Sequence, residues 1–333
     1  MKKTILSLLF ALISVGMLYA QVKFPRDTSY TIQSTYNKLL KYHPGIQPVY
    51  MQHLPEVKMV KDMVYQNYGG REMHLDLFFP AASKPDIKLP VVIMIHGGGW
   101  ISGDKSLQWA MAEKIASKGY VCATVEYRML LEAGYPAAVV DIKTAVRFLR
   151  SLSGNYPIDT EKFAIYGCSA GGQLASLVAS TNNYNHYADT LAYKNFSNRI
   201  QALIDVDGVL DFLHKDASEV QQGKETLSTR WFGCYPQENR AIWDEGAALT
   251  HVDKDFPPTL LLKSQQDRFL AGHQDLSAKL DSLGIYNEYH CIEGSPHSFW
   301  HLEPWFTPTS EYVIAFLDKT FKNSSQSINE INK

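Results

Sequence analysis

Short apolar runs alternate with longer amphipathic stretches along most of this 333-residue chain. Six of the runs, most of them rich in Val, Ile and Leu, are typical of strands buried on both faces. They occupy residues 91–95, 121–125, 163–166, 202–206, 259–262 and 287–292. Amphipathic stretches predict helices over residues 107–117, 137–152, 172–180, 274–283 and 311–321. The alternation predicts an α/β fold, with a mostly parallel sheet that carries helices on both faces.

Two upstream segments extend this sheet, and one later segment interrupts the alternation of strands and helices. Residues 59–65 and 73–79 are strand-like and are joined through "NYGGRE", which predicts an antiparallel pair at one edge of an eight-stranded sheet. Residues 211–256 contain Trp231 and Trp243 among many polar positions. We interpret this segment as a small insertion over the sheet rather than a second domain.

The predicted domain organisation follows from these patterns. Residues 56–322 form the α/β domain, and the polar residues 323–333 form a flexible tail. Residues 21–55 form an N-terminal extension without a pattern of its own. We favour a segment that wraps the domain, with a lid near the active site as the alternative.

The first twenty residues, "MKKTILSLLFALISVGMLYA", are typical of a secretory signal peptide. Lys2 and Lys3 precede an apolar core over residues 5–16, and Ala20 supplies a small residue for cleavage. An N-terminal membrane anchor is the alternative, although the apolar core is short for a span. We therefore expect an exported protein, periplasmic or secreted, without stable membrane insertion after the signal is removed.

Composition and charge exclude several other classes. The chain is 45% hydrophobic and 20% charged, as in ordinary globular proteins. Its net charge is −2, and removal of Lys2 and Lys3 with the signal makes it −4. No basic block is present, so a nucleic acid is not expected as a partner.

The four cysteines predict neither a metal site nor a firm disulfide framework. They are Cys122, Cys168, Cys234 and Cys291, and none has a C-x-x-C spacing. Export permits disulfides. We favour buried small hydrophobic residues instead, because Cys122, Cys168 and Cys291 lie in or beside apolar runs.

The stretch "IYGCSAGGQLA", residues 165–175, places a serine between two glycines after a strand and before a helix. It contains the pattern G-x-S-x-G, formed by Gly167, Ser169 and Gly171. A sharp strand-to-helix turn leaves no room for side chains at the flanking positions and presents the serine hydroxyl at its apex. Ser169 is therefore the candidate nucleophile.

A second motif, "HGGGW", follows the strand at residues 91–95. Three successive glycines leave bare backbone amides, which suit the binding of a developing oxyanion. We predict an oxyanion hole built from Gly97, Gly98 and Gly99 together with the amide of Ala170. His96 is interpreted as a structural support of this loop, and a plain glycine turn is the alternative.

A serine nucleophile needs a base and an orienting acid, which follow it in the chain order Ser, acid, His. Asp267 follows the strand at residues 259–262, and His297 follows the last strand. We predict Asp267 as the acid and His297 as the base. Asp207 is the alternative acid, and His301 is the alternative base.

These motifs in this order resemble the α/β-hydrolase superfamily. Within it, residues 56–320 are similar to an exported esterase and lipase group that includes bifunctional feruloyl and acetyl-xylan esterases. Hormone-sensitive-lipase-like carboxylesterases are close relatives of that group. The segments that carry the resemblance further are "LDLFFP", "VEYRML", "YPAAVVDIKTAVRFLR", "YPIDTEKFAIYGCSAGG" and "HVDKDFPPTLLLKSQQD". Three departures lie in loops that line the cleft: Cys168 beside the serine, "SQQD" before Asp267 and "SPHSFW" around His297.

The resemblance implies a serine carboxylesterase that needs no metal or organic cofactor. Its expected substrates are short-chain acyl esters, acetyl or feruloyl, on plant polysaccharides or their fragments. Trp100, Trp231, Trp243, Trp300 and Trp305 offer sugar-stacking faces, with a role in the core as the favoured reading for at least half of them. A serine amidase or exopeptidase, or a catalytically silent binding protein on the same scaffold, remains an alternative. The sequence does not indicate an oligomeric state.

Overall fold

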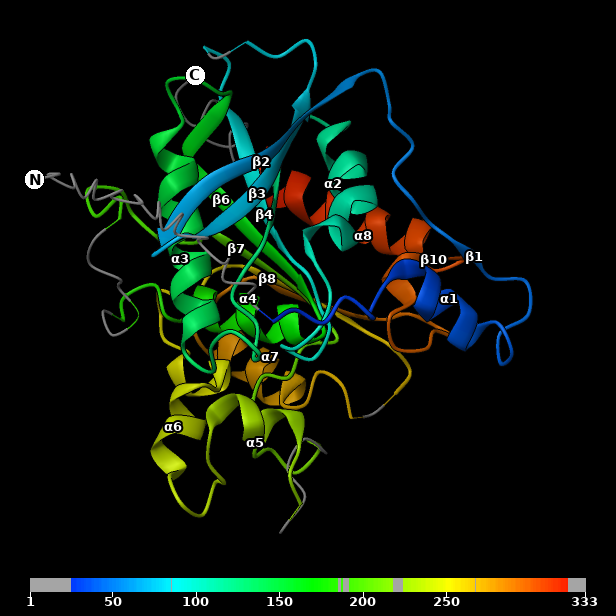
Figure 1. Ribbon diagram of the computed structural model, residues 1–333, viewed down its shortest axis with the longest axis vertical. Coiled ribbons are helices and arrows are strands. Elements are labelled where there is room, and N and C mark those ends of the chain that lie inside the picture. The colour runs from blue at the N-terminus through cyan, green and yellow to red at the C-terminus, as the bar shows by residue number, and fades with distance from the viewer. Residues whose placement is uncertain are drawn as a thin grey trace, which may run out of the picture.

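The computed structural model describes residues 25–84, 86–184, 187, 192–217, 224–266 and 268–322. The predicted signal peptide and the C-terminal tail lie outside these residues. Within them, eight strands form one sheet with the order β2-β3-β5-β4-β6-β7-β8-β9 (Figure 1). Their bounds are β2 Val57–Tyr68, β3 Arg71–Pro80, β4 Leu89–Ile95, β5 Val121–Val125, β6 Ile158–Cys168, β7 Ala202–Val206, β8 Thr259–Lys263 and β9 Asn287–Cys291.

The predicted α/β sheet is confirmed, including its antiparallel edge. β2 pairs with β3, and β3 with β5, in antiparallel register. The other five pairings are parallel. All carboxyl ends of the parallel strands therefore meet at one edge of the sheet, where sites of open α/β folds are found.

Helices cover both faces of the sheet, as the pattern predicts. Their bounds are α1 Ile32–Leu39, α2 Trp109–Ala116, α3 Ala137–Ser151, α4 Ala170–Ser180, α5 Leu227–Phe232, α6 Arg240–Glu245, α7 His273–Ser282 and α8 Phe306–Phe321. Short 3-10 turns are η1 Lys105–Gln108, η3 Ala248–His251 and η4 Phe299–His301. The predicted helix at residues 311–321 starts five residues too late. Its first turn contains Pro308, which a first helical turn tolerates but a periodicity argument does not recognise.

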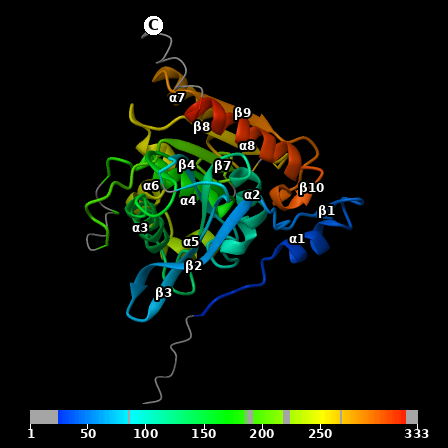
Figure 2. The ribbon, with the colours of Figure 1, turned by 90° about the horizontal axis from the view of Figure 1, so that it is seen from above.

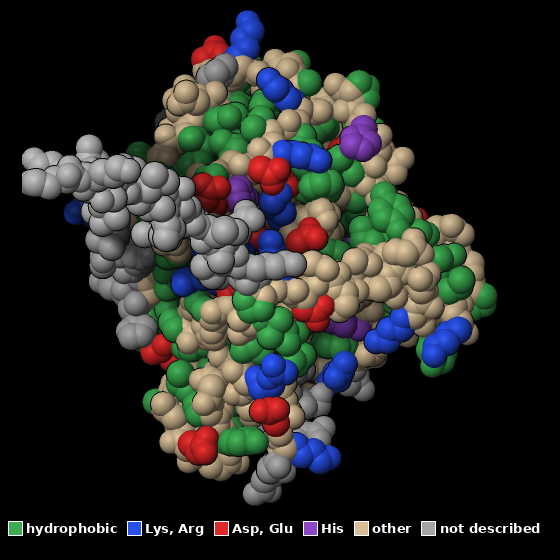
Figure 3. Space-filling model, viewed as in Figure 1, with side chains coloured by type: hydrophobic (Ala, Val, Ile, Leu, Met, Phe, Trp, Pro, Cys, Tyr) green, Lys and Arg blue, Asp and Glu red, His purple; other side chains and the backbone are tan. Residues whose placement is uncertain are grey.

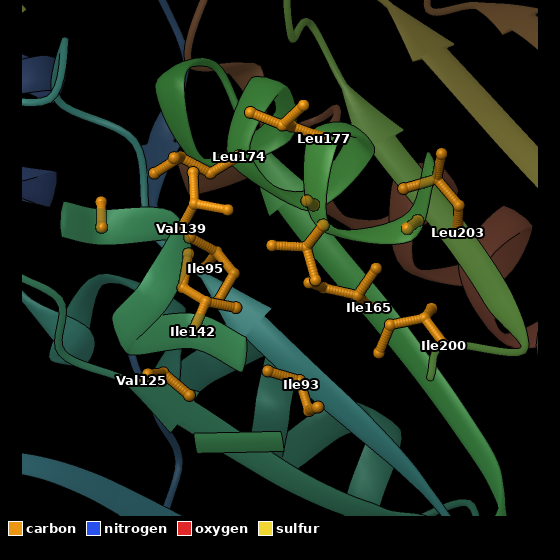
Figure 4. Packing of buried hydrophobic residues seen from close by; sticks show 14 of the residues in the cluster. Ile93, Ile95, Val125, Val139, Ile142, Ile165, Leu174, Leu177, Ile200 and Leu203 are labelled. Carbon is orange, nitrogen blue, oxygen red and sulfur yellow. The ribbon is translucent and has the colours of Figure 1, made fainter. Parts of the chain in front are cut away.

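Side chains at alternate positions of the strands point to opposite faces of the sheet and pack into two separate apolar clusters. Ile93 and Ile95 of β4 point into a cluster with α3, α4 and α7, as Figure 4 shows for the α3 and α4 side. Val92 and Met94 point into the opposite cluster with α2 and α8. Both sets are fully buried, which explains why β4 has a continuous apolar run rather than alternation.

The N-terminal extension wraps the α2 and α8 side of the domain. Its two-residue strand β1 Gln47–Pro48 pairs antiparallel with β10 Leu302–Glu303, and α1 lies beside them in both ribbon views (Figures 1 and 2). The buried carboxylate of Glu113 on α2 accepts from the backbone N–H groups of Gln52 and Leu54 at 2.6 and 2.8 Å. These contacts support the predicted wrap, but the extension also lines the active-site cavity described below.

The segment 211–256 carries α5 and α6 at one end of the molecule (Figure 1). Trp231 and Trp243 are buried in the same apolar cluster as α3 and α4. Trp231 stacks on Trp100 with ring centroids 5.2 Å apart. All five tryptophans proposed above as sugar platforms are buried, which favours the core role. Trp100 also lines the cavity described below.

The cysteine expectation is right for two positions and wrong for one. Cys122 and Cys168 are buried, whereas Cys291 is exposed. Cys291 ends β9, the edge strand, whose residues are all half-buried or exposed. All four cysteines are free thiols.

The surface in Figure 3 shows basic and acidic side chains interspersed with apolar ones over the described part of that face. Across the described residues, no helix has the length and apolar character that a membrane span requires.

Candidate active site

Ser169 lies at the sharp turn between β6 and α4, at the carboxyl end of the sheet. Its φ of 56° and ψ of −123° are strained values for a non-glycine residue. A Cβ added at Gly167 would lie 2.0 Å from the carbonyl oxygen of Gly171. A Cβ added at Gly171 would lie 2.3 Å from the carbonyl oxygen of Ile95. Both glycines of the motif are therefore required by close backbone packing, which holds the serine hydroxyl at the apex.

The structure brings Ser169 and His297 together. Their Oγ and Nε2 atoms are 2.9 Å apart. His297 Nδ1 lies 2.8 Å from a carboxylate oxygen of Asp207 and donates to it. The Nδ1–H tautomer leaves Nε2 free to accept the serine proton, as a general base must.

Among the described residues, the acid that contacts His297 is Asp207, which the sequence offers as the alternative to Asp267. Asp267 itself lies outside the described residues. Asp207 directly follows β7, which pairs with β6 so that Cys168 is opposite Val206. The next residues of the two strands, Ser169 and Asp207, are therefore neighbours across the sheet edge.

Asp207 is held rigidly for this position. It is buried, with 1% of its surface exposed. Its second carboxylate oxygen accepts from the Ser264 N–H at 2.7 Å, and its own N–H donates to Leu262 at 2.9 Å. Its φ of 57° turns the chain sharply after the strand. The "DG" pair at residues 207–208, directly after a buried run, is the sequence signal that favours this acid.

Aromatic rings fix the orientation of His297. The Phe269 ring stacks on its imidazole with centroids 3.5 Å apart and planes at 9°. Trp300 meets the imidazole edge-on at 5.1 Å. The alternative base, His301, is buried, and its Nε2 accepts from the Trp300 indole at 3.0 Å. That hydrogen bond occupies the nitrogen that the role of base would need.

The glycine loop lies opposite the serine. Gly98, Gly99 and Ala170 line the same cavity as Ser169. In the described part of the chain, the N–H groups of Gly98 and Gly99 donate to no backbone acceptor. Ala170 is the first residue of α4, so its N–H has no partner within the helix. Gly97 does not line the cavity; it packs behind Ser169, where an added Cβ would lie 3.1 Å from the serine Cβ.

Buried side chains hold this loop from behind. His96 Nδ1 lies 2.7 Å from the Gly97 carbonyl oxygen, and the Tyr127 hydroxyl donates to the His96 carbonyl at 2.9 Å. The Trp100 indole donates to Gln173 of α4 at 3.0 Å. Burial lowers the pKa of His96 to about 4, so its imidazole is neutral at ordinary pH. These contacts agree with a supporting role for His96.

A second buried carboxylate, Asp205, supports the turn that carries Asp207. It accepts from the Ser176 hydroxyl at 2.5 Å and from the Gly208 N–H at 2.8 Å. Burial raises its pKa from 3.8 to about 7, although both hydrogen bonds act in the opposite direction. The native protein therefore holds a proton on Asp205 over a pH range in which the unfolded chain has lost it.

We expect the free energy of unfolding of the wild type to fall as pH rises from about 4 to about 7, because the native state keeps the Asp205 proton and the unfolded state loses it. The native state binds more protons than the unfolded state in that window, so the free energy of unfolding falls by up to about 1.4 kcal/mol per pH unit. The isosteric Asp205→Asn variant should lack this contribution. Urea unfolding of both proteins between pH 4 and pH 8 measures the difference. Curves that run parallel would contradict the assignment.

The cavity around Ser169 has a volume of about 300 Å³. Trp100, Val209, Leu227 and Phe269 form its apolar walls. Tyr30 and Lys38 of the N-terminal extension also line it, so this segment contributes to the site as well as wrapping the domain. The volume lies at the lower end of the range for small-molecule sites.

Comparison with known proteins places the chain in a family. The BD-FAE family model matches residues 75–281, which include Ser169 and Asp207. The chain belongs to the BD-FAE family. The match ends before His297, so the base lies beyond the part of the BD-FAE domain that the comparison aligns.

Individual relatives are more distant. Esterase LipC of Mycobacterium tuberculosis is 24% identical over 273 residues, which cover 79% of this chain and 66% of LipC. The chain spans about half to two thirds of the length of the first curated relatives that it matches.

Two solved structures share the fold of this BD-FAE member. A truncated carbohydrate esterase from gut microbiota has a TM-score of 0.69 and 20% identity, over 81% of this chain and 99% of that one. A bifunctional GH43-CE protein of Bacteroides eggerthii has a TM-score of 0.68 and 23% identity, over 79% of this chain and 35% of that one.

Proposed function

We propose that this protein is a serine carboxylesterase. The observation that carries the proposal is the hydrogen-bonded chain from Ser169 through His297 to Asp207. Beside it lie the amides of Gly98 and Gly99, which donate to no backbone acceptor in the described part of the chain. The names of its relatives, an esterase and a carbohydrate esterase, support ester hydrolysis.

The geometry accounts for acyl transfer to water. Ser169 Oγ attacks the ester carbonyl carbon while His297 Nε2 takes its proton. Asp207 keeps the Nδ1–H tautomer and stabilises the imidazolium that forms. The amides of Gly98, Gly99 and Ala170 bind the oxyanion, which is typically worth about 3–4 kcal/mol per strong donor.

The reaction is completed in two stages, acylation of the serine and hydrolysis of the acyl-serine, each through its own tetrahedral intermediate. His297 returns the proton to the alcohol oxygen, and the C–O bond breaks to leave an acyl-serine. A water molecule attacks that acyl group while His297 takes its proton. The proton passes to Ser169 as the carboxylic acid leaves. These steps use only groups that the described residues supply.

We further propose that the protein is exported and acts on short-chain acyl esters of plant polysaccharides or their fragments. The signal-like residues 1–20 support export. The narrow cavity, with Trp100 and Leu227 in its walls, suits a short acyl group better than a long one. The carbohydrate-esterase relative supports a saccharide as the alcohol.

The test is hydrolysis of p-nitrophenyl acetate, butyrate and octanoate by the chain without residues 1–20, with the Ser169→Ala variant beside it. We expect serine-dependent turnover that is fastest with acetate and slowest with octanoate. Matched acetanilides, assayed in parallel, test the amidase and peptidase alternative. Absence of turnover with every ester would overturn the proposal and favour a silent scaffold.

A further inference from the structure

A second cavity opens next to the one that holds Ser169. It has a volume of about 220 Å³ and shares five lining residues with the first cavity: Tyr30, Lys38, Arg268, His297 and Ser298. It does not include Ser169 or the glycine loop. The two cavities therefore meet at His297, one on the nucleophile's side and the other beyond the base.

This arrangement indicates which part of an ester enters each cavity. His297 delivers its proton to the oxygen of the leaving alcohol, so the alcohol must lie on the His297 side. The acyl group must lie with the nucleophile and the oxyanion donors. The second cavity, which we name the alcohol-side cavity, is thus positioned for the alcohol part of the substrate.

The lining of the alcohol-side cavity combines apolar surface, which includes Leu39, with several polar groups and two cations. Tyr30, Ser34, Gln266 and Ser298 contribute polar groups, and Lys38 and Arg268 contribute two cations. Lys38 lies on α1, in the N-terminal extension, and Arg268 lies in the loop after β8. Both cations also line the cavity of Ser169.

Neither cation has a carboxylate partner among the described residues. Lys38 and Arg268 are both exposed. Asp207 is the one acidic side chain among the described residues that line either cavity, and it is engaged with His297. Among the described residues that line the two cavities, two cations stand beside one paired acid, so these residues together contribute positive charge.

Aromatic stacking places one of these cations close to the reacting groups. The Arg268 guanidinium lies over the Phe269 ring at 4.4 Å from its centroid. The same ring stacks on His297. Arg268 is therefore separated from the catalytic base by a single aromatic ring.

We propose that the alcohol-side cavity recognises an alcohol that carries a carboxylate, namely the uronate group of an acidic saccharide. The inference rests on the proposed esterase function and names its substrate class. Lys38 and Arg268 bind the carboxylate, while the saccharide hydroxyl that bears the acyl group points to Ser169. The N-terminal extension is then part of the substrate site.

The experiment compares acetate release from a monoacetylated methyl glucuronoside and from the matched methyl glucoside, both at low salt. Exposed ion pairs contribute modestly, so we expect the wild type to prefer the glucuronoside by about 3- to 30-fold in kcat/KM. The preference should fall as NaCl is raised to 0.5 M, because salt screens exposed charges. In the Lys38→Gln and Arg268→Gln double variant, the ratio should approach one.

The Lys41→Gln variant is the matched control, because Lys41 lies just beyond α1 and lines neither cavity. It should keep the wild-type ratio. Equal rates on the two sugars, or a preference that survives in the double variant, would overturn this inference.

A further arm compares p-nitrophenyl hemisuccinate with p-nitrophenyl butyrate. A preference for hemisuccinate without one for the glucuronoside would place the anion in the acyl pocket and overturn the assignment. Turnover of p-nitrophenyl acetate by the wild type shows that the esterase function stands in either case. Its absence would mean that the proposed function has failed first.

Discussion

Replacing Asp207 by Asn should lower kcat for ester hydrolysis by about 10⁴-fold. The asparagine amide is isosteric, and its oxygen can still accept from the Ser264 N–H. Its NH₂ group then faces His297 Nδ1 and favours the tautomer with the proton on Nε2. An imidazole in that form cannot take the proton of Ser169, so the base is lost while the geometry is kept.

The matched variant Asp267→Asn separates the two candidate acids. Because Asp207 already occupies the Nδ1 side of His297, we expect Asp267→Asn to keep kcat within about threefold of the wild type. Steady-state kinetics with p-nitrophenyl acetate measure both variants, and thermal unfolding checks that each is folded. A large loss in Asp267→Asn with little loss in Asp207→Asn would return the role to Asp267.

The Ser169→Ala variant should lose about 10⁵- to 10⁶-fold in kcat. Removal of Oγ deletes the nucleophile and the hydrogen bond to His297, while the backbone turn remains. The change removes one partly exposed hydroxyl, so the free energy of unfolding should change by no more than about 1 kcal/mol.

Covalent labelling makes the serine test specific. A p-nitrophenyl alkylphosphonate should add one phosphonyl group per wild-type chain, seen by intact-protein mass spectrometry, and none to Ser169→Ala. Equal labelling of both proteins would show that another residue reacts. Retention of more than a few per cent of turnover by a folded Ser169→Ala protein would exclude Ser169 as the nucleophile.

Local sequence patterns predict the fold, the nucleophile Ser169 and the base His297. Continuous apolar runs predict buried parallel strands because both faces of each strand must be covered. The glycines around Ser169 are recognisable as a local motif. The structure shows why no side chain fits there: an added Cβ would lie 2.0 Å from the Gly171 carbonyl oxygen or 2.3 Å from that of Ile95. His297 is predictable because it follows the last strand, at the edge where the site of a parallel sheet forms.

The acid is less predictable from sequence, because Asp207 and Asp267 both follow predicted parallel strands. Sequence order does not show which strand lies next to the nucleophile. Sheet order does: β7 pairs directly with β6, while β8 is one strand further away. The register of Cys168 with Val206 then places Asp207 beside Ser169, and His297 completes the chain of hydrogen bonds.

The sequence by itself thus predicted the elements, the serine turn and the base, since each is marked by a pattern of residues that are neighbours along the chain. Only the tertiary structure decided the acid, the burial of all five tryptophans and the entry of Tyr30 and Lys38 into the active-site cavity. Those features depend on which distant segments pack together. Tyr30 and Lys38, for example, line the same cavity as Ser169, although more than one hundred residues of sequence separate them from it. The physical reason is that close packing selects partners by shape and position in space, which local periodicity does not record.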